Sequence, residues 1–188
     1  MQSCCAKSTG VAGAERVSKY AADAFLHATQ TLEGYEFRQR IGKAEVVMEP
    51  VGVAALITPW NSNASFICSK LAMALAAGCT AVIKPSEMSA MQTQVVLEAL
   101  HAAELPPGLF NVVNGRGNVV GAQFSTHPDV AKVSFTGRTA VGKAILKAGA
   151  DTMKRVTLEL GGKSPTVLLP DADFASAVPL WPSRWLPQ

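Results

Sequence analysis

The chain has 188 residues, of which 48% are hydrophobic and 16% are charged, and its mean hydropathy of +0.20 excludes intrinsic disorder of the whole chain. This length predicts one domain with, at most, the remnant of a second. The net charge of +3 arises from 17 Lys and Arg against 14 Asp and Glu, which are spread along the sequence. Without a basic stripe, the composition predicts no nucleic-acid partner and favours a small metabolite.

Neither the cysteines nor the apolar segments predict export or a membrane anchor. The cysteine spacing fits neither a metal site nor a disulfide framework, which predicts a reduced, cytoplasmic chain. The uncharged run Pro50–Ser69 is long enough to cross a bilayer, but Pro59 and Asn61 interrupt its middle. We therefore expect a strand, a loop and a helix there, and no membrane partner. The four cysteines are Cys4, Cys5, Cys68 and Cys79.

The first 49 residues predict a tail, a helix and a hairpin. We expect residues 1–10 to form a disordered tail and residues 11–33 to form a helix, because apolar side chains recur there at helical spacing and Gly34 follows as a stop. In residues 34–49, apolar and charged side chains alternate on both sides of Gly42 and Lys43. This alternation around a glycine turn predicts a β-hairpin.

From residue 50 to residue 162, short apolar runs alternate with helical patterns. Such alternation predicts the α/β class, with a doubly wound parallel sheet and helices on both of its faces. Sheets of this kind bind ligands beyond the carboxyl ends of their strands. The predicted strands are Val51–Ile57, Thr80–Lys84, Leu109–Asn114, Val130–Phe135 and Arg155–Leu160. The predicted helices are Asn61–Ala77, Met91–Ala103, Asn118–Phe124 and Thr139–Ala148.

The C-terminal residues depart from this alternation. Residues 163–178 contain a further predicted strand at Thr166–Leu169. Residues 179–188 hold 3 of the 11 prolines and 2 of the 3 tryptophans, and they continue no helical period. We interpret this last segment as an aberrant tail that is foreign to the α/β pattern.

Two loops that follow predicted strands carry polar side chains suited to a site. After the first strand, Asn61 could aim an amide N–H at a developing oxyanion, or it could simply cap the next helix. After the second strand, Lys84 and Glu87 suit the hydroxyls of a ribose. The alternative for this second loop is an ordinary N-terminal cap made by Ser86 and Glu87.

Two further loops are rich in glycine. Gly115, Gly117 and Gly121 contain a G-x-G pair but miss the spacing of the dinucleotide fingerprint by one residue, a pattern that is more often a tight turn than a nucleotide site. Between a strand and a helix, Gly137, Gly142 and Lys143 match most of the P-loop pattern, although Ala144 stands where a metal-binding Ser or Thr is required. A P-loop nucleotide-binding protein is therefore a rival hypothesis.

The end of the last predicted strand carries a carboxylate. Glu159 precedes Gly161 and Gly162, so substrate or water could approach it closely. It could then serve as a general base. The alternative is a solvated glutamate at a turn.

Taken together and in this order, five segments resemble the aldehyde dehydrogenase superfamily of oxidoreductases. The resemblance extends over about residues 34–178 and implies a Rossmann-like dinucleotide-binding domain at 50–162, preceded by an oligomerisation hairpin and followed at 163–178 by the first strand of a catalytic domain. It also implies the NAD(P)-dependent oxidation of an aldehyde to a carboxylic acid. The five segments are Glu49–Asn61, Ala74–Glu87, Pro106–Gly117, Val133–Gly137 and Val156–Pro165.

The resemblance assigns roles to individual residues. Asn61 would stabilise the oxyanion and Glu159 would activate the hydrolytic water. Lys84 and Glu87 would hold the adenosine ribose, and because Glu87 would repel a 2′-phosphate, NAD is favoured although NADP stays possible. The implied cofactor-binding residues are Ile57, Thr58, Pro59, Trp60, Lys84, Ser86, Glu87, Gly117, Gly121, Phe135, Thr136, Gly137, Arg138, Val141 and Leu160.

Two departures from the family pattern affect these roles. Arg138 stands where the family commonly has Ser, and its size could obstruct the pyrophosphate. The family's nucleophilic cysteine lies in an Asn-Gly-Gln-x-Cys segment, which does not occur in the 29 residues after Glu159. We therefore expect this polypeptide alone to be inactive, because neither Cys68 nor Cys79 is placed to substitute. A further hypothesis is a non-catalytic module that docks on full-length subunits through the hairpin at residues 36–49.

Overall fold

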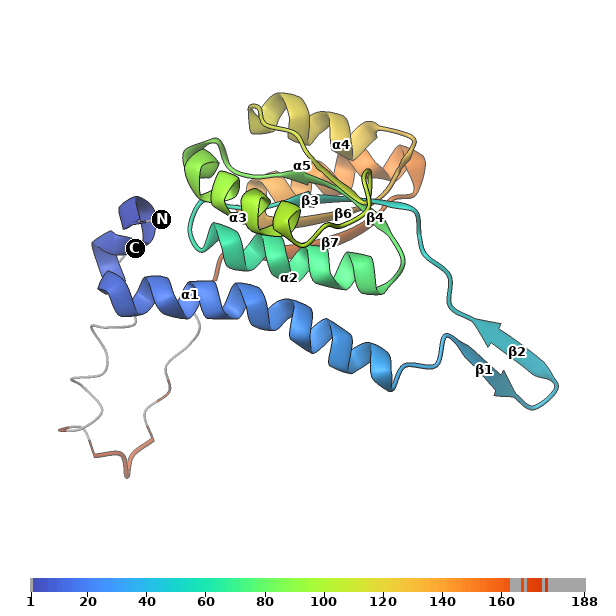
Figure 1. Ribbon diagram of the computed structural model, residues 1–188, viewed down its shortest axis with the longest axis horizontal. Helices are drawn as coiled ribbons and strands as arrows, with labels where there is room; N and C mark the ends of the chain where they lie inside the picture. The colour runs from blue at the N-terminus through green and yellow to red at the C-terminus, as the bar shows by residue number, and fades with distance from the viewer. Residues whose placement is uncertain (1, 163–166, 168, 174, 176–188) are drawn as a thin grey trace.

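Five strands form one parallel sheet in the order β5-β4-β3-β6-β7 (Figure 1). The computed structural model describes residues 2–162, 167, 169–173 and 175. The strand of this sheet that comes first in the chain, β3, lies at its centre; β4 and β5 follow on one side and β6 and β7 on the other, which confirms the doubly wound, Rossmann-like prediction. The strands are β3 (Val53–Ile57), β4 (Thr80–Lys84), β5 (Phe110–Val112), β6 (Val130–Gly137) and β7 (Arg155–Leu160).

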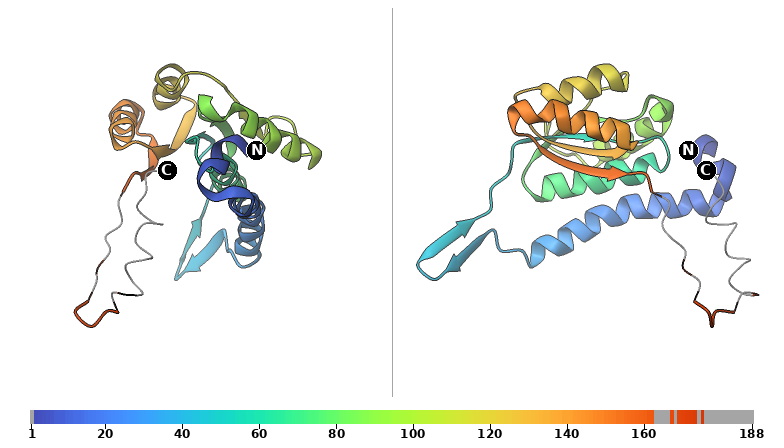
Figure 2. Two further views of the ribbon diagram at one scale, coloured as in Figure 1. Left: turned by 90° about the vertical axis from the view of Figure 1, so that its left-hand side faces the viewer. Right: turned by 180° about the vertical axis from the view of Figure 1, so that it is seen from behind.

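Helices cover the two faces of this sheet (Figure 2). One buried cluster joins β3 and β4 to α1, α2 and α3, and a second joins β3 and β6 to α5 on the opposite face. Successive residues of β3 alternate between the clusters, since Ala54 and Leu56 belong to the first and Ala55 and Ile57 to the second. The helices are α1 (Gln2–Glu33), α2 (Asn63–Ala76), α3 (Ala90–Ala102), α4 (Ala122–Thr126) and α5 (Thr139–Gly149).

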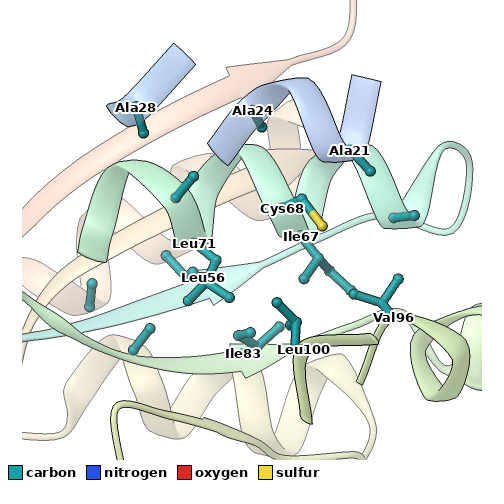
Figure 3. Close-up of a cluster of buried hydrophobic side chains, with 14 residues drawn as sticks. Ala21, Ala24, Ala28, Leu56, Ile67, Cys68, Leu71, Ile83, Val96 and Leu100 are labelled. Carbon is teal, nitrogen blue, oxygen red and sulfur yellow. The ribbon is translucent and has the colours of Figure 1, made fainter. Parts of the chain in front are cut away.

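The first cluster is the larger core (Figure 3). Leu71 of α2 is fully buried against the sheet, together with Leu56 and Ile83. The long helix α1 packs on α2 through three alanines, Ala21, Ala24 and Ala28, whose small side chains let the two helix backbones approach closely. The core therefore fixes α2, whose first residue lies beside the predicted site.

The predicted disordered tail at residues 1–10 is wrong, because α1 begins at Gln2. The apolar spacing starts only near residue 11, but no proline interrupts the residues before Pro50. Extending an existing helix costs far less than nucleating one, so helical backbone continues upstream of the amphipathic segment. The structure thus joins the predicted tail and helix into one element.

The predicted hairpin is present. Strands β1 (Arg38–Ile41) and β2 (Ala44–Val47) pair antiparallel around a two-residue turn, in which Gly42 has a φ of 61°. All eight strand residues are exposed, and the hairpin projects away from the five-stranded sheet (Figure 1). Nothing in the described part of the chain covers either of its faces.

The other predicted helices and strands differ from those of the structure mainly at their ends. The helix predicted at residues 118–124 is instead a π-helical turn at Gly117–Gly121 followed by α4. The predicted strand Thr166–Leu169 and the tail 179–188 lie outside the described residues, apart from Val167 and Leu169. Among the described residues, no helix combines the length and apolar character needed to cross a bilayer.

Gln92 of α3 provides a test of packing. Its side chain is buried, and neither amide atom has a hydrogen-bond partner among the described residues. Because an unpaired buried amide is costly, Gln92→Met is expected to raise the free energy of unfolding by about 1 kcal/mol. Urea denaturation would measure this change in the free energy of unfolding. Replacement of the exposed Gln94 by Met is the control, and it should change the free energy of unfolding by less than about 0.5 kcal/mol. Destabilisation by Gln92→Met would show that the amide has a partner.

Candidate functional site

The strand register brings the predicted site residues to one edge of the sheet. Ile57, at the end of β3, pairs with Lys84 of β4 on one side and with Phe135 of β6 on the other. Further along β6, Gly137 pairs with Leu160 of β7. The loops after β3, β4 and β6 and the end of β7 therefore meet at the carboxyl edge of the sheet. Doubly wound sheets bind ligands at this edge, at the point where the chain changes from adding strands on one side of the first strand to adding them on the other.

The loop after β4 contains an ion pair between a buried ammonium and a half-exposed carboxylate. Lys84 Nζ donates to the carbonyl of Pro85 at 3.0 Å and to Glu87 Oε2 at 3.1 Å, and the Lys84 side chain is 3% exposed against 49% for Glu87. The other carboxylate oxygen of Glu87 accepts the backbone N–H of Gly117 at 2.9 Å. Glu87 thus links two predicted cofactor loops and keeps an oxygen-rich face toward solvent.

The pKa of Glu87 lies below its usual range. The main cause is its own backbone N–H, and hydrogen bonds from Lys84 and from the backbone of Gly117 add to it. A lowered carboxyl pKa means that the folded chain favours the charged form. Its contribution to stability is therefore complete above about pH 5 and is lost as the pH falls through the lowered pKa.

Ser86 makes the N-terminal cap that the sequence offered as an alternative. Its hydroxyl accepts the N–H of Met88 at 3.3 Å and starts the 3₁₀ turn Glu87–Ser89. Because Glu87 turns instead toward Lys84 and Gly117, Ser86 makes the cap alone and the Glu87 carboxylate is not used for capping. The two interpretations of this loop are therefore compatible.

The loop after β3 leaves Asn61 available to a ligand. Asn61 is exposed, and α2 is preceded by Ser62, whose side chain makes no capping hydrogen bond. The proposed alternative, in which Asn61 caps this helix, is therefore wrong. Trp60 beside it is also partly exposed, so the loop presents an amide and an aromatic face together at the carboxyl edge.

In the loop after β6, the structure gives Gly137 a packing role that the sequence did not predict. A Cβ atom at Gly137 would lie 2.6 Å from Cζ of Phe135, so any larger residue there would have to displace the buried ring of Phe135. The space beside Gly137 is thus filled by protein, and packing accounts for this residue. Arg138 next to it is exposed, and its carbonyl accepts the first free N–H groups of α5, from Val141 and Gly142.

This loop is too short for a P-loop. Only Arg138 separates β6 from α5, whereas a P-loop needs several residues between its glycines to surround a phosphate. Gly142 and Lys143 lie inside α5, and a Cβ at Gly142 would come within 2.8 Å of Leu160 on β7. Gly142 therefore serves helix-to-sheet packing, and the rival nucleotide-hydrolase hypothesis is not supported.

Glu159 lies beside a lysine that the sequence did not single out. Lys70 of α2 donates to the Ser134 hydroxyl at 2.9 Å. Burial lowers the pKa of Lys70, the charge of Lys132 lowers it further, and the charge of Glu159 acts in the opposite direction. Glu159 itself is exposed and pairs in register with Thr136, whose buried hydroxyl has no partner among the described residues. The general-base candidate thus sits on a polar strip of the sheet face.

Neither Cys68 nor Cys79 reaches this edge. Cys68 is buried in the α1–α2 core, and Cys79 precedes β4 at the opposite, amino edge of the sheet. Burial raises the pKa of the Cys68 thiol to about 11, which disfavours the reactive thiolate. Among the described residues, no cluster of three His, Cys, Asp or Glu side chains could hold a metal ion.

The raised pKa of Cys68 has a measurable consequence. At about pH 8 only about one thiol in a thousand is ionised, so alkylation of Cys68 by iodoacetamide is expected to be at least about 100-fold slower in the folded chain than in urea. Mass spectrometry of tryptic peptides would separate Cys68 from the other cysteines. Equal rates in the two conditions would contradict its burial.

The sheet order and these loops define a dinucleotide-binding fold of the Rossmann class. The model of the "Aldehyde dehydrogenase family" matches residues 6–181. A 3-succinoylsemialdehyde-pyridine dehydrogenase of Pseudomonas sp is 49% identical over 82% of this chain and 32% of its own length. The chloroplastic betaine aldehyde dehydrogenase of Beta vulgaris is 46% identical over 72% of this chain and 27% of its own.

Solved structures of aldehyde dehydrogenases are also similar to this chain. An aldehyde dehydrogenase C mutant from Pseudomonas syringae, complexed with NAD+ and octanal, has a TM-score of 0.85 at 48% identity, over 87% of this chain and 34% of that one. Betaine aldehyde dehydrogenase from Staphylococcus aureus, in complex with NAD+, has a TM-score of 0.82 at 36% identity over 87% and 34%. The chain belongs to the aldehyde dehydrogenase family and spans about a third of the length of these relatives.

Proposed function

We propose that this chain forms the NAD-binding part of an aldehyde dehydrogenase, with the cofactor held at the carboxyl edge of the sheet. The observation that carries the proposal is the Lys84–Glu87–Gly117 arrangement, which fixes a half-exposed carboxylate beside the point where the strand order reverses. A carboxylate there accepts hydrogen bonds from ribose hydroxyls and repels a 2′-phosphate, which favours NAD over NADP.

Each loop at this edge has a proposed part in binding. The backbone from Ile57 to Pro59 and the ring of Trp60 line the cofactor groove, and exposed Arg138 at the start of α5 meets the pyrophosphate. Lys84 is buried, so it acts by orienting the carboxylate of Glu87. Bound NAD supplies the acceptor for hydride, and the remaining chemistry belongs to side chains of the protein.

Two of these side chains, those of Asn61 and Glu159, have proposed parts in the reaction of the aldehyde. The exposed amide of Asn61 donates to the aldehyde oxygen as negative charge develops on it. Glu159 takes a proton from the attacking water. Of the cysteines, Cys68 and Cys79 lie away from this edge, and Cys4 and Cys5 lie in the first turns of α1. We infer that the 188-residue polypeptide by itself forms no thiohemiacetal with an aldehyde at this edge.

Two measurements test this function. NAD at 100 times its Kd is expected to stabilise the chain by about 2.7 kcal/mol in thermal or urea unfolding, whereas ATP with magnesium gives no comparable effect. With NAD and a simple aldehyde such as octanal, no NADH absorbance should appear. Absence of any NAD-dependent stabilisation would contradict the binding proposal, and steady NADH production would contradict the inference about the cysteines.

The hairpin is proposed as an oligomer contact. An isolated two-stranded hairpin is marginally stable, and Ile41, Val46 and Met48 are exposed on this one. A second copy, or a longer subunit of the same family, could cover them. Sedimentation analysis should show association that Ile41→Lys weakens.

The free, buried state of Cys68 and Cys79 supports a reducing compartment such as the cytoplasm.

A further inference from the structure

A continuous path of buried side-chain hydrogen bonds runs behind the candidate site. Thr58 Oγ1 donates to Asn63 Oδ1 at 3.3 Å, and Asn63 Nδ2 donates to Thr93 Oγ1 at 2.8 Å. Thr93 Oγ1 in turn donates to the carbonyl of Ser89 at 3.0 Å. Asn63 is 1% exposed, Thr93 2% and Thr58 4%, so water cannot replace these partners.

The two ends of this path lie in different ligand-binding loops. Thr58 directly follows β3, and Asn63 is the first residue of α2, so their hydrogen bond closes the loop that contains Trp60 and Asn61. At the other end, the Ser89 hydroxyl donates to the carbonyl of Ser86 at 3.0 Å, in the loop that carries Glu87. Asn63 is therefore the link between the proposed oxyanion loop and the proposed ribose loop.

The backbone beside Asn63 shows that this loop is held under constraint. Ser62 has φ 52° and ψ 33°, a left-handed conformation that is unfavourable for a residue with a side chain, and it makes no compensating cap. Such conformations persist only where the surroundings enforce them. The two hydrogen bonds of the Asn63 amide, one to each side, supply that constraint.

We propose that Asn63 is a positioning residue, which fixes the Pro59–Ser62 loop relative to the Glu87 loop through its buried hydrogen bonds to Thr58 and Thr93. It touches no ligand itself. This inference rests on the proposed function for its effect on NAD, but its effect on the loop is independent of any ligand. Loss of the link frees the backbone of Trp60 and Asn61 while the sheet and α2 remain folded.

Loop motion provides the first test. ¹⁵N relaxation of the backbone N–H groups of Trp60 and Asn61 should give order parameters near about 0.85 in the unmodified chain and below about 0.6 in Asn63→Ala. Val96→Ala is the matched control, because Val96 lies about one turn along α3 from Thr93, is also buried and belongs to the apolar core. It removes core packing without touching the link, so its loop order parameters should stay at the unmodified value.

NAD affinity provides the second test. By calorimetry, Asn63→Ala and Thr93→Val are expected to weaken NAD binding about tenfold, the size of one lost buried hydrogen bond. Val96→Ala should change the affinity less than twofold despite its lower thermal stability. Thr93→Ser keeps the hydroxyl and should restore binding to within about twofold, which a purely structural role of the Thr93 methyl group would not do.

The outcomes separate the inference from the proposed function. If the unmodified chain does not bind NAD, the proposed function is wrong, and the relaxation data still decide whether Asn63 holds the loop. If NAD binds but Asn63→Ala and Val96→Ala behave alike in both measurements, the positioning role is wrong. Circular dichroism of every variant confirms that it is folded under the conditions used.

Discussion

Replacing Leu71 by alanine is expected to lower the free energy of unfolding by about 3 kcal/mol. Leu71 is fully buried between α2 and the sheet, where Leu56 and Ile83 contact the same core (Figure 3). The truncation removes buried methyl groups and leaves a cavity that the two rigid layers cannot close. Because folded domains of this size are stable by only about 5–15 kcal/mol, this loss is a large share of the total.

The control for Leu71 lies two residues along the same helix. Met73 is 50% exposed, so Met73→Ala should change the free energy of unfolding by less than about 0.5 kcal/mol. Urea denaturation monitored by circular dichroism measures both variants under identical conditions. A change below about 1 kcal/mol for Leu71→Ala would mean that α2 does not pack on the sheet as the structure has it.

Replacing Glu87 by alanine is expected to weaken NAD binding by about 30-fold, since hydrogen bonds to a charged acceptor contribute about 1.5–3 kcal/mol. The substitution removes the proposed acceptor of the ribose hydroxyls and also releases Lys84 Nζ and the backbone N–H of Gly117. In the unmodified chain the lowered pKa of Glu87 keeps the carboxylate charged. NAD affinity should therefore stay constant from about pH 8 down to about pH 5.

Two further variants separate the causes of this loss. Lys84→Met combined with Glu87→Ala leaves no buried unpaired ammonium, so any remaining deficit in affinity belongs to the ribose contact. Glu98→Ala removes an exposed carboxylate of α3 that pairs only with Gln94 among the contacts described, and it should leave the affinity unchanged. If Glu87→Ala binds NAD as tightly as Glu98→Ala does, the ribose does not contact this loop.

Much of the fold follows from local sequence patterns. The apolar run ending at Ile57 and the alternation around Gly42 each contain their own signal, because strand formation and hairpin turns are favoured by residues that are neighbours in the sequence. The start of α1 could not be predicted in this way, since residues 2–10 carry no apolar spacing and are helical as an extension of the segment that follows. The π-helical turn at Gly117–Gly121 has no comparable local pattern.

The candidate site was predictable only in part, for a related reason. Residues at or just beyond the carboxyl ends of strands, such as Asn61, Glu87 and Glu159, can be selected from the sequence because parallel strands end at one edge. Asn63 and Lys70 donate hydrogen bonds to Thr93 and Ser134, partners that only the folded chain brings near. The packing of the glycines could not be predicted without the structure, since a Cβ atom at Gly137 would crowd Phe135 and one at Gly142 would crowd Leu160.

The central place of β3 bears on how the chain is synthesised. Val53 pairs with Thr80 on one side and with Val130 on the other, so one edge of β3 finds its partner long before the second partner leaves the ribosome. During that interval the half made of β3, β4 and β5 has an unpaired edge that a chaperone or another nascent chain could occupy. Ribosome-bound intermediates that end before β6 should therefore be the most prone to aggregate.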